Sequence, residues 1–410
     1  MSNLINIGTL WVRRTIILSF FLASLILSFA LFGRSNISAE CTPAGTIAHN
    51  NIPRQVGVSS TGTAIVDGKP FFPFGFYHVS WESTPEERGN DLEAIAEGGF
   101  NIIHASLKRF ESIESYGKFL DRAGELGVYV ITEFGLGPTI PPLEVINSLK
   151  DKPAVFGWNV ADDVDNGRVT PANVSNQYCQ FIQADPNHLT YISGYTKDEI
   201  ANFINTVDAV GLQSYPVGRK GNRPISWTYD VISTARNFAR KNRLILANTQ
   251  AFRWNPENAA TAQNARAPNI KEIRNMTYQS LIAGVKGILY FTYYDGYWNF
   301  SEHPQLWQQM KQLVPEIKRL SPMLLEGNYQ EVNLGENILS GVWTLQNKGF
   351  AIIVNTDRDR SLAVSLALPT QSVRATFPNR ANRLKFDRGK LSGKVPPLGV
   401  SVYSFNMSSS

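Results

Sequence analysis

Acidic and aromatic side chains recur directly after short apolar segments in this chain of 410 residues. Asp162, Asp163 and Asp165 end or follow one such segment, and Asp295 lies among aromatic residues in YYDGYW. Sugars have apolar faces that stack on aromatic rings and hydroxyl groups that need polar partners. The combination therefore favours a cleft that binds carbohydrate. The simpler alternative is that these rings only cover the protein surface.

The other candidate side chains share the same position, because each ends or follows a segment typical of a β-strand. Those expected to bind sugar hydroxyls are His78, Gln213, Tyr215 and Gln250. Those expected to stack on sugar rings are Trp81, Trp158 and Trp254. The expected binding surface also includes Glu133, Asp162 and Tyr294.

Eight apolar segments typical of β-strands alternate with helical segments and would position these residues. The expected strands are 71–77, 100–107, 128–134, 154–162, 189–193, 208–215, 243–250 and 287–294. Thr84 is expected to cap the first helix, with Pro85 in its first turn, and a later helix is expected near 197–205. Apolar strands that alternate with helices imply a parallel sheet covered on both faces.

Eight such units within about 250 residues match an α/β fold of the closed (β/α)8 TIM-barrel type. A doubly wound open sheet is the alternative, but it usually carries a Gly-rich phosphate-binding turn after its first strand, and none follows 71–77. Active sites of closed barrels lie at the C-terminal ends of the strands. The candidate side chains would therefore meet at one mouth.

The pattern changes near Glu326, where short strand-like segments follow one another without helices. This composition predicts a C-terminal antiparallel β-sandwich over 325–410. The barrel is expected over 63–324, with an Asp67-Gly68 hairpin turn near its start. A polar linker over 41–62 would precede it.

The N-terminal residues 1–40 have the order of an export signal. Arg13 and Arg14 precede the uncharged segment 15–32, which is long for a signal peptide and just long enough to span a bilayer. We expect either a cleaved signal peptide or an N-terminal membrane anchor, with the rest of the chain outside the cytoplasm in both cases. Cys41 and Cys179 are the only cysteines, and the sequence leaves open whether they pair.

Other classes of function have little support. The net charge is 39 − 34 = +5 and is scattered, so a nucleic-acid partner is not expected. No pair of histidines has the spacing of metal ligands, and no G-x-S-x-G motif is present, so neither a metal nor another cofactor is expected. No feature of the sequence indicates an oligomeric state.

Six motifs carry a family resemblance in their order along residues 60–322. They are VDGKPFFPFGFY, GGFNII, AVFGWNVADD, DAVGLQSYP, LILANTQAF and GVKGILYFTYYDG. This succession resembles the strands of the TIM-barrel glycoside hydrolases related to clan A, many of which carry a C-terminal sandwich. The resemblance implies a glycosidase that uses two carboxyl groups, one as general acid and one as base or nucleophile. The position of the family's acid/base Glu is taken here by Asp163, with Asp162 beside it.

The second carboxylate departs from the family pattern. Gln250 stands where clan A enzymes carry a Glu after the seventh barrel strand, and a neutral amide cannot be a nucleophile. Asp295 is our first choice for the second carboxylate, and Glu133 and Asp162 are the alternatives. The departure also keeps open a barrel that binds carbohydrate, or serves in the cell envelope, without turnover.

The N-terminal expectation can be tested on the native protein. Because basic residues precede the apolar segment 15–32, we expect the protein outside the cytoplasm, either without its first 40 or so residues or bound to membranes. Cell fractionation with N-terminal sequencing measures both. A soluble cytoplasmic protein that retains Met1 would contradict the expectation.

Overall fold

The computed structural model describes residues 56–135, 139–218, 223–257, 265–377 and 384–407. The expected leader, Cys41 and most of the expected linker lie outside these ranges. Cys179 lies buried on a helix and is not a free thiol, and its pairing with Cys41, which the sequence leaves open, falls outside the described ranges. Within the described ranges, no helix combines the length and hydropathy needed to cross a bilayer.

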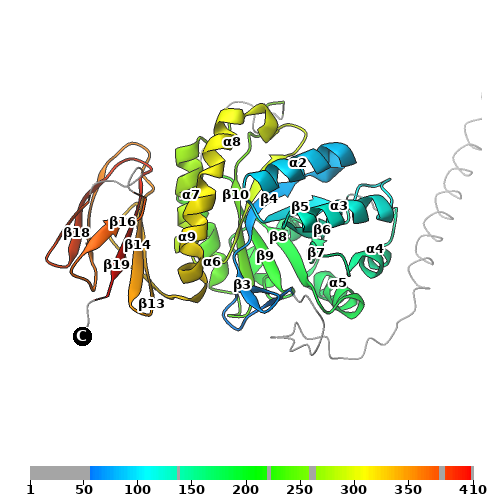
Figure 1. Ribbon diagram of the computed structural model, residues 1–410, viewed down its shortest axis with the longest axis horizontal. Helices are drawn as coiled ribbons and strands as arrows, with labels where there is room; N and C mark the ends of the chain where they lie inside the picture. The colour runs from blue at the N-terminus through cyan, green and yellow to red at the C-terminus, as the bar shows by residue number, and fades with distance from the viewer. Residues whose placement is uncertain (1–55, 136–138, 219–222, 258–264, 378–383, 408–410) are drawn as a thin grey trace, which may run out of the picture. The chain divides into compact units, whose positions relative to one another are not determined.

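Eight parallel strands close into a barrel, as the sequence predicted (Figure 1). The strands are β4 (Phe74–His78), β5 (Ile102–Ser106), β6 (Tyr129–Glu133), β7 (Val155–Ala161), β8 (Leu189–Gly194), β9 (Ala209–Ser214), β10 (Leu244–Gln250) and β11 (Ile288–Tyr294). Each strand pairs with the next along the chain, and β11 pairs with β4 to close the ring. The open-sheet alternative is thereby excluded.

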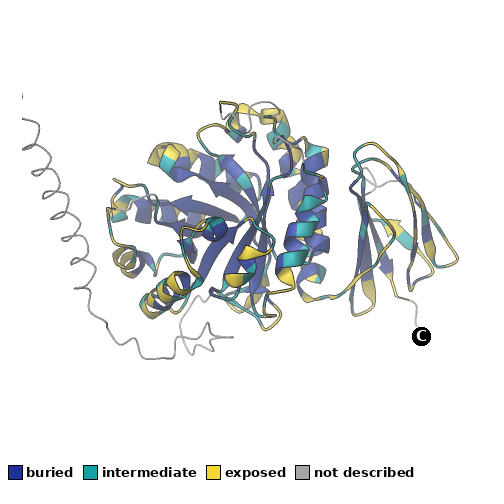
Figure 2. Ribbon diagram, turned by 180° about the vertical axis from the view of Figure 1, so that it is seen from behind, coloured by how far each residue is buried: buried dark blue, intermediate teal, exposed yellow. Residues whose placement is uncertain are grey.

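Helices cover the outside of the barrel, so the strands are buried while the outward helix faces are exposed (Figure 2). The helices are α2 (Pro85–Glu97), α3 (Ile113–Glu125), α4 (Pro142–Leu149), α5 (Pro171–Ala184), α6 (Trp227–Arg236), α7 (Ile270–Ile282), α8 (Pro304–Lys311) and α9 (Leu313–Glu326). Thr84 caps α2 as expected: its hydroxyl accepts from the Glu87 N–H at 3.1 Å, and the Glu87 carboxylate accepts from the Thr84 N–H at 2.6 Å.

The prediction of a helix near 197–205 is wrong. The structure has only the short 3-10 helix η3 (Glu199–Asn202) there. Asp198 at its start makes no side-chain capping hydrogen bond, so nothing offsets the unsatisfied N–H groups of a longer helix. Similar 3-10 turns follow other strands near the barrel mouth: η1 (Ser80–Glu82), η2 (Val164–Asn166) and η5 (Phe300–Glu302).

A small antiparallel sheet precedes the barrel. It consists of β1 (Val56–Val58), β2 (Ala64–Val66) and β3 (Lys69–Phe71). Asp67 and Gly68 form its turn with φ of 49° and 75°, the left-handed values that a tight hairpin requires. Val56 and Ala64 pack into the same buried cluster as Leu244 and other inward residues of the barrel strands. The hairpin therefore closes the N-terminal end of the barrel and leaves the opposite end as the mouth.

The C-terminal part is the expected antiparallel β-sandwich. One sheet has the order β12-β13-β14-β19-β16 and the other has the order β15-β18-β17. Its strands are β12 (Asn328–Glu331), β13 (Ile338–Leu345), β14 (Lys348–Asn355), β15 (Leu362–Ala367), β16 (Val373–Ala375), β17 (Lys385–Asp387), β18 (Lys390–Val395) and β19 (Val400–Asn406). Their inward aliphatic and aromatic residues form a separate buried cluster.

Polar contacts join α7 to the sandwich. The Asn275 amide donates to the Asn355 carbonyl at 2.9 Å, and Arg274 donates to the Val400 carbonyl at 3.2 Å. Glu272, only 1% exposed, pairs with Arg266 at 2.8 Å and with Arg358 from the sandwich. Burial alone would raise the pKa of Glu272, but the two guanidinium groups outweigh it and lower the pKa to about 2.

The first stability prediction concerns this ion pair. A carboxyl with a lowered pKa stabilises the fold above its ordinary value of 4.5, and that contribution is lost as the pH falls toward about 2. Glu272→Gln should therefore lower the free energy of unfolding at pH 7 by roughly 3 kcal/mol and flatten its fall below pH 4.5. Urea unfolding across this pH range measures both. Glu144→Gln on the exposed face of α4 is the control, and equal losses in the two variants would refute the assignment.

Candidate active site

Three carboxyl groups gather at the ends of two neighbouring barrel strands. Glu133 ends β6, and Asp162 and Asp163 follow β7 directly. Ser193 on β8 donates its hydroxyl to Asp162 and accepts a hydrogen bond from the Asp163 N–H at 3.1 Å. Gln213 on β9 donates its amide to Asp163 Oδ1 at 2.6 Å and to Ser193 Oγ at 2.9 Å. Side chains from four successive strands thus hold one acidic cluster.

The backbone at Asp163 sends these two adjacent carboxyl groups to different partners. Asp163 adopts the left-handed conformation, with φ 48° and ψ 46°, which non-glycine residues rarely adopt. Two residues on, the carboxylate of Asp165 accepts from the N–H groups of Tyr195 at 2.9 Å and Thr196 at 2.6 Å. Asp165 is buried and thereby fastens the turn to the loop after β8, while Asp162 is exposed and Asp163 is half-buried.

Burial and mutual repulsion raise the pKa of every carboxyl in this cluster. Burial, reinforced by the charge of Asp162, raises the pKa of Glu133 to about 8. The same two causes raise the pKa of Asp163 to about 6, and burial raises the pKa of Asp162. Glu133 therefore keeps its proton at neutral pH, and its own hydrogen bond comes from the Ser106 hydroxyl. Carboxyl groups with raised pKa values can remain protonated near neutral pH, as a general acid must.

Asp295 stands after β11, next to the strand on which the barrel closes. Its carboxylate accepts from the Tyr297 N–H at 3.1 Å, and its own N–H donates to the Trp298 carbonyl at 3.0 Å. Burial raises the pKa of Asp295 to about 6. Asp295 is half-buried and so remains open to a substrate in the mouth.

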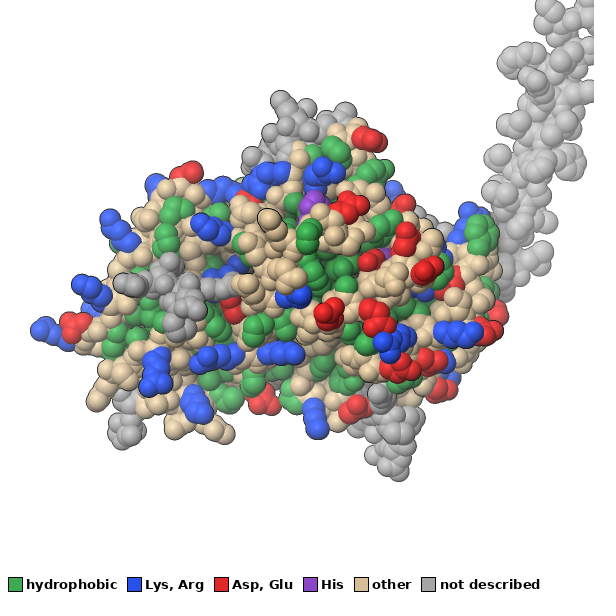
Figure 3. Space-filling view, turned by 45° about the horizontal axis from the view of Figure 1, so that its top comes forward, with side chains coloured by type: hydrophobic (Ala, Val, Ile, Leu, Met, Phe, Trp, Pro, Cys, Tyr) green, Lys and Arg blue, Asp and Glu red, His purple; other side chains and the backbone are tan. Residues whose placement is uncertain are grey.

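The Tyr215 hydroxyl is influenced by the charge of Asp295 and by the charges of the acidic cluster. Burial raises the pKa of this hydroxyl well above the ordinary value, and the charges of Asp163, Asp162 and Asp295 raise it further. The charges of both acidic groups thus act on the Tyr215 hydroxyl, which has no hydrogen-bond partner among the described residues. A sugar hydroxyl could satisfy it. Figure 3, which turns the upper end of Figure 1 forward, shows hydrophobic side chains in the middle of that face and acidic ones beside them.

Aromatic rings extend this surface. The Tyr215 ring packs against Phe252 and Trp254, with centroids 5.2 and 6.1 Å apart. Trp254 is half-buried, and its indole N–H donates to the Val217 carbonyl at 2.8 Å, which fixes the ring. Trp81 on η1 is also half-buried. Both retain ring surface on which a sugar could stack.

His78 and Trp158 are not brought to this surface. His78 is fully buried and bonds Asp91 at 2.7 Å through Nε2, while Trp158 is fully buried and donates to Asp185 at 2.8 Å. With no exposed surface, neither can contact a sugar, so the binding roles expected for them do not fit this structure. Tyr294 covers His78, with ring centroids 5.3 Å apart, and stays half-buried at the mouth.

Gln250 is enclosed as well. Its amide accepts from the Val217 N–H at 2.7 Å and donates to the Val217 carbonyl at 2.8 Å. The Gln250 amide thus pairs with both backbone groups of Val217, as a neighbouring strand would, and holds the loop after β9 against β10. Gln250 therefore shapes the mouth under Trp254 rather than offering its amide to a substrate.

Ser193 and His104 are the residues of this site that the sequence analysis did not identify. Ser193 is the last residue of the expected strand 189–193, and that position was its only signal. His104 is fully buried beneath Tyr77, with ring centroids 3.7 Å apart, and burial lowers its pKa to about 3. Tyr77 in turn donates its hydroxyl to Asp162 at 3.4 Å. In the described part of the chain, no group of three or more His, Cys, Asp or Glu side chains is arranged to hold a metal ion.

Comparison with known proteins shows the fold class. No family model matches the chain, and no curated protein matches it. AmyP in complex with maltose superposes with a TM-score of 0.59 at 11% identity, covering 82% of this chain and 97% of AmyP. An Anoxybacillus α-amylase gives 0.58 at 12% identity, covering 83% and 98% of the two chains. AmyB, a maltogenic α-amylase from Thermotoga neapolitana, gives 0.57 at 12% identity, covering 82% and 99%.

These likenesses span both the barrel and the sandwich. The chain therefore has the fold of the TIM-barrel glycoside hydrolases with a C-terminal β-sandwich, as its ordered motifs implied. At identities near 12% the likeness extends to the fold alone.

The raised pKa of Glu133 gives a prediction independent of any substrate. A carboxyl with a raised pKa stabilises the fold below its ordinary value of 4.5, and that contribution is lost as the pH rises toward about 8. Glu133→Gln removes this loss, so its stability relative to the parent should increase by on the order of 3 kcal/mol between pH 4.5 and 7. Paired urea titrations at both pH values measure this. A difference that does not change with pH would show that Glu133 ionises normally.

Proposed function

We propose that the chain is a glycoside hydrolase that acts on a carbohydrate outside the cytoplasm. The observation that carries the proposal is that Asp163 and Asp295 both follow barrel strands at the mouth, are half-buried, and have a pKa raised by burial to about 6. Their position at the C-terminal ends of barrel strands is where this fold builds its active sites. The solved neighbour AmyP was captured with maltose, which supports a carbohydrate ligand.

Asp163 is assigned the role of general acid. Gln213 binds its Oδ1 at 2.6 Å, which leaves Oδ2 to carry the proton. That proton passes to the glycosidic oxygen as its bond to the anomeric carbon breaks. Burial first, and then the charge of Asp162, disfavour a negative charge on Asp163 and so help it retain its proton.

Asp295 is assigned the role of the second carboxylate. Once ionised, it either takes a proton from the attacking water or attacks the anomeric carbon itself. The Tyr215 hydroxyl, Trp254 and Trp81 would hold the sugar, the first by a hydrogen bond and the others by stacking. The expected secretion, with or without an uncleaved membrane anchor, would give this site access to an extracellular or periplasmic glycan.

The second candidate function is carbohydrate binding without turnover. One observation favours it: Gln250 occupies the position of the family's usual nucleophile, and its amide is committed to the Val217 backbone. In that case Asp163 and Asp295 would bind sugar hydroxyls as hydrogen-bond acceptors. Release of reducing ends from a panel of neutral oligosaccharides and polysaccharides distinguishes the two functions, because a binder would retain the glycan intact.

Substitution of the acid tests the assignment directly. Asp163→Asn removes the proton donor but keeps the side-chain shape, so kcat/KM should fall on the order of 10²–10⁴-fold with little change in binding. Asp295→Asn should give a comparable loss. Asp151→Asn, an exposed carboxyl before β7 at the other end of the barrel, is the control. Parent activity that persists in Asp163→Asn would refute the acid assignment.

The pH dependence follows from the same pair. The acid must be protonated, so activity should fall above about pH 6, and the second carboxylate must be ionised, so activity should fall below about pH 6. We expect a narrow bell-shaped profile of kcat/KM centred near this value. In Asp163→Asn the alkaline limb should disappear for substrates with good leaving groups. A profile that is flat from pH 5 to 8 would contradict the proposed pair.

A further inference from the structure

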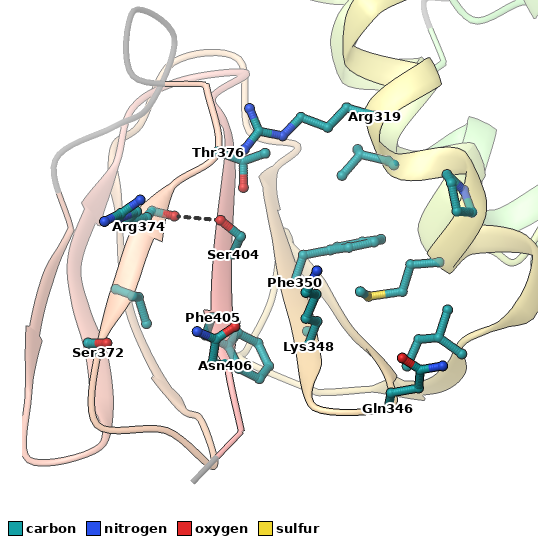
Figure 4. A pocket seen from close by; sticks show the side chains of 16 residues that line it. Arg319, Gln346, Lys348, Phe350, Ser372, Arg374, Thr376, Ser404, Phe405 and Asn406 are labelled. Carbon is teal, nitrogen blue, oxygen red and sulfur yellow. Dashed lines mark hydrogen bonds between the residues drawn. The ribbon is translucent and has the colours of Figure 1, made fainter.

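A groove lies between helix α9 and the five-stranded sheet of the sandwich (Figure 4). Its volume is about 810 Å³, within the range of sites that hold small ligands. One wall is the last turns of α9, and the other comprises β14, β19, β16 and the ends of their connecting turns. None of the residues assigned to the barrel mouth lines it.

The groove is basic. Arg319 enters from α9, and Lys348 enters from the start of β14 on the opposite wall. Arg374 on β16 adds a third cation, and none of the described residues lining the groove is acidic. Arg319, Lys348 and Arg374 are all exposed. Like charges on facing walls repel one another, so an anion between them would relieve this repulsion.

A buried hydroxyl beside these cations has no partner. Thr376 is only 4% exposed, and its Oγ1 makes no hydrogen bond to any described residue. Figure 4 shows Arg319 reaching from α9 toward Thr376, with Ser404 on the neighbouring strand. Leaving a buried hydroxyl unpaired is unfavourable, and a polar group of a ligand would supply the missing hydrogen bond.

The remaining lining combines apolar surface with small polar groups. Pro322 and Met323 on α9 and Leu345 on β13 keep apolar surface exposed to the groove. The polar groups are the hydroxyls of Ser372 and Ser404 and the amides of Gln346 and Asn406. A sugar ring presents an apolar face and a rim of hydroxyls, so it matches both kinds of surface. A carboxylate on the ring would match the cations.

We propose that this groove binds an acidic oligosaccharide, a short chain of uronic-acid residues, at a site separate from the barrel mouth. A carboxylate lies between Arg319 and Lys348, a ring hydroxyl bonds Thr376, and the ring faces rest on Pro322, Met323 and Leu345. The binding does not depend on the proposed glycosidase activity, although it would hold an acidic glycan close to the enzyme.

Calorimetric titration of the full chain tests the proposal. The probes are tetrasaccharides of galacturonate, glucuronate and mannuronate, each beside its methyl ester, which keeps the sugar but removes the charge. We expect at least one acid to bind ten or more times more tightly than its ester, and to bind more weakly as salt increases. If none of the three acids binds, or if each ester binds as tightly as its acid, the proposal is wrong.

Variants place the binding in the groove. Arg319→Gln and Lys348→Gln, both exposed positions that should not disturb folding, should each weaken binding about tenfold, as expected for loss of a charge-assisted contact. Thr376→Val should weaken it without changing the salt dependence. Lys394→Gln, an exposed lysine on the other sheet, is the charge-matched control.

The remaining outcomes distinguish binding in the groove from binding at the barrel mouth, and recognition of a sugar from recognition of charge alone. Binding that survives Asp163→Asn while cleavage is lost supports two separate sites, whereas binding lost in Asp163→Asn and unchanged in Arg319→Gln would assign the ligand to the mouth and overturn the proposal. A tetraglutamate peptide that binds as tightly as the best uronate would also overturn it, because the groove would then recognise charge without sugar.

Discussion

The pairing of β11 with β4 is the constraint on which the rest of this molecule depends. Parallel strands whose ladder closes on itself have no free edge, and all their C-terminal ends must then lie on one ring. Closure brings Asp295, near the end of the barrel sequence, to the same mouth as Asp162 and Asp163. Without it, Tyr215 could not lie in the electric field of both acidic groups.

The mouth of the barrel brings desolvated carboxyl groups together, which is energetically unfavourable. The charge of Asp162 repels that of Asp163 and disfavours ionisation of Glu133, and Asp163 adds a left-handed backbone conformation. The hydrogen bonds that Ser193 donates to Asp162 and Gln213 donates to Asp163 offset part of this cost. Strained backbone and shifted carboxyl groups in one place are typical of functional sites, because selection for stability alone would remove them.

Gln250 stands where the resembling glycosidases carry a carboxylate, and its hydrogen bonds show what the amide does in that position. Gln250 uses both ends of its amide on Val217, a pattern that a carboxylate could not reproduce because it has no N–H to donate. The amide thus gives the loop after β9 a rigid support, and Asp295, the second carboxylate of the proposed function, follows the neighbouring strand β11 instead. The sandwich, joined to α7 by Glu272 and Asn275, contributes its own surface without entering the mouth.

Sequence periodicity by itself determined the barrel, the sandwich, the hairpin turn at Asp67-Gly68 and the cap at Thr84, because each depends on neighbouring residues or on a repeated local pattern. It also determined which acidic residues follow which strands. It failed for the helix near 197–205, where only the turn η3 forms. Only the tertiary structure decided which side chains face the mouth, since strand ends and bulges rotate individual residues by contacts far away in the chain. His78, Trp158 and Gln250 form hydrogen bonds to buried partners. Ser193, by contrast, donates to Asp162, and His104 packs against Tyr77, although nothing in the sequence marked either residue. The pKa shifts belong to the same category, because they arise from burial and from charges that approach one another only once the barrel has closed.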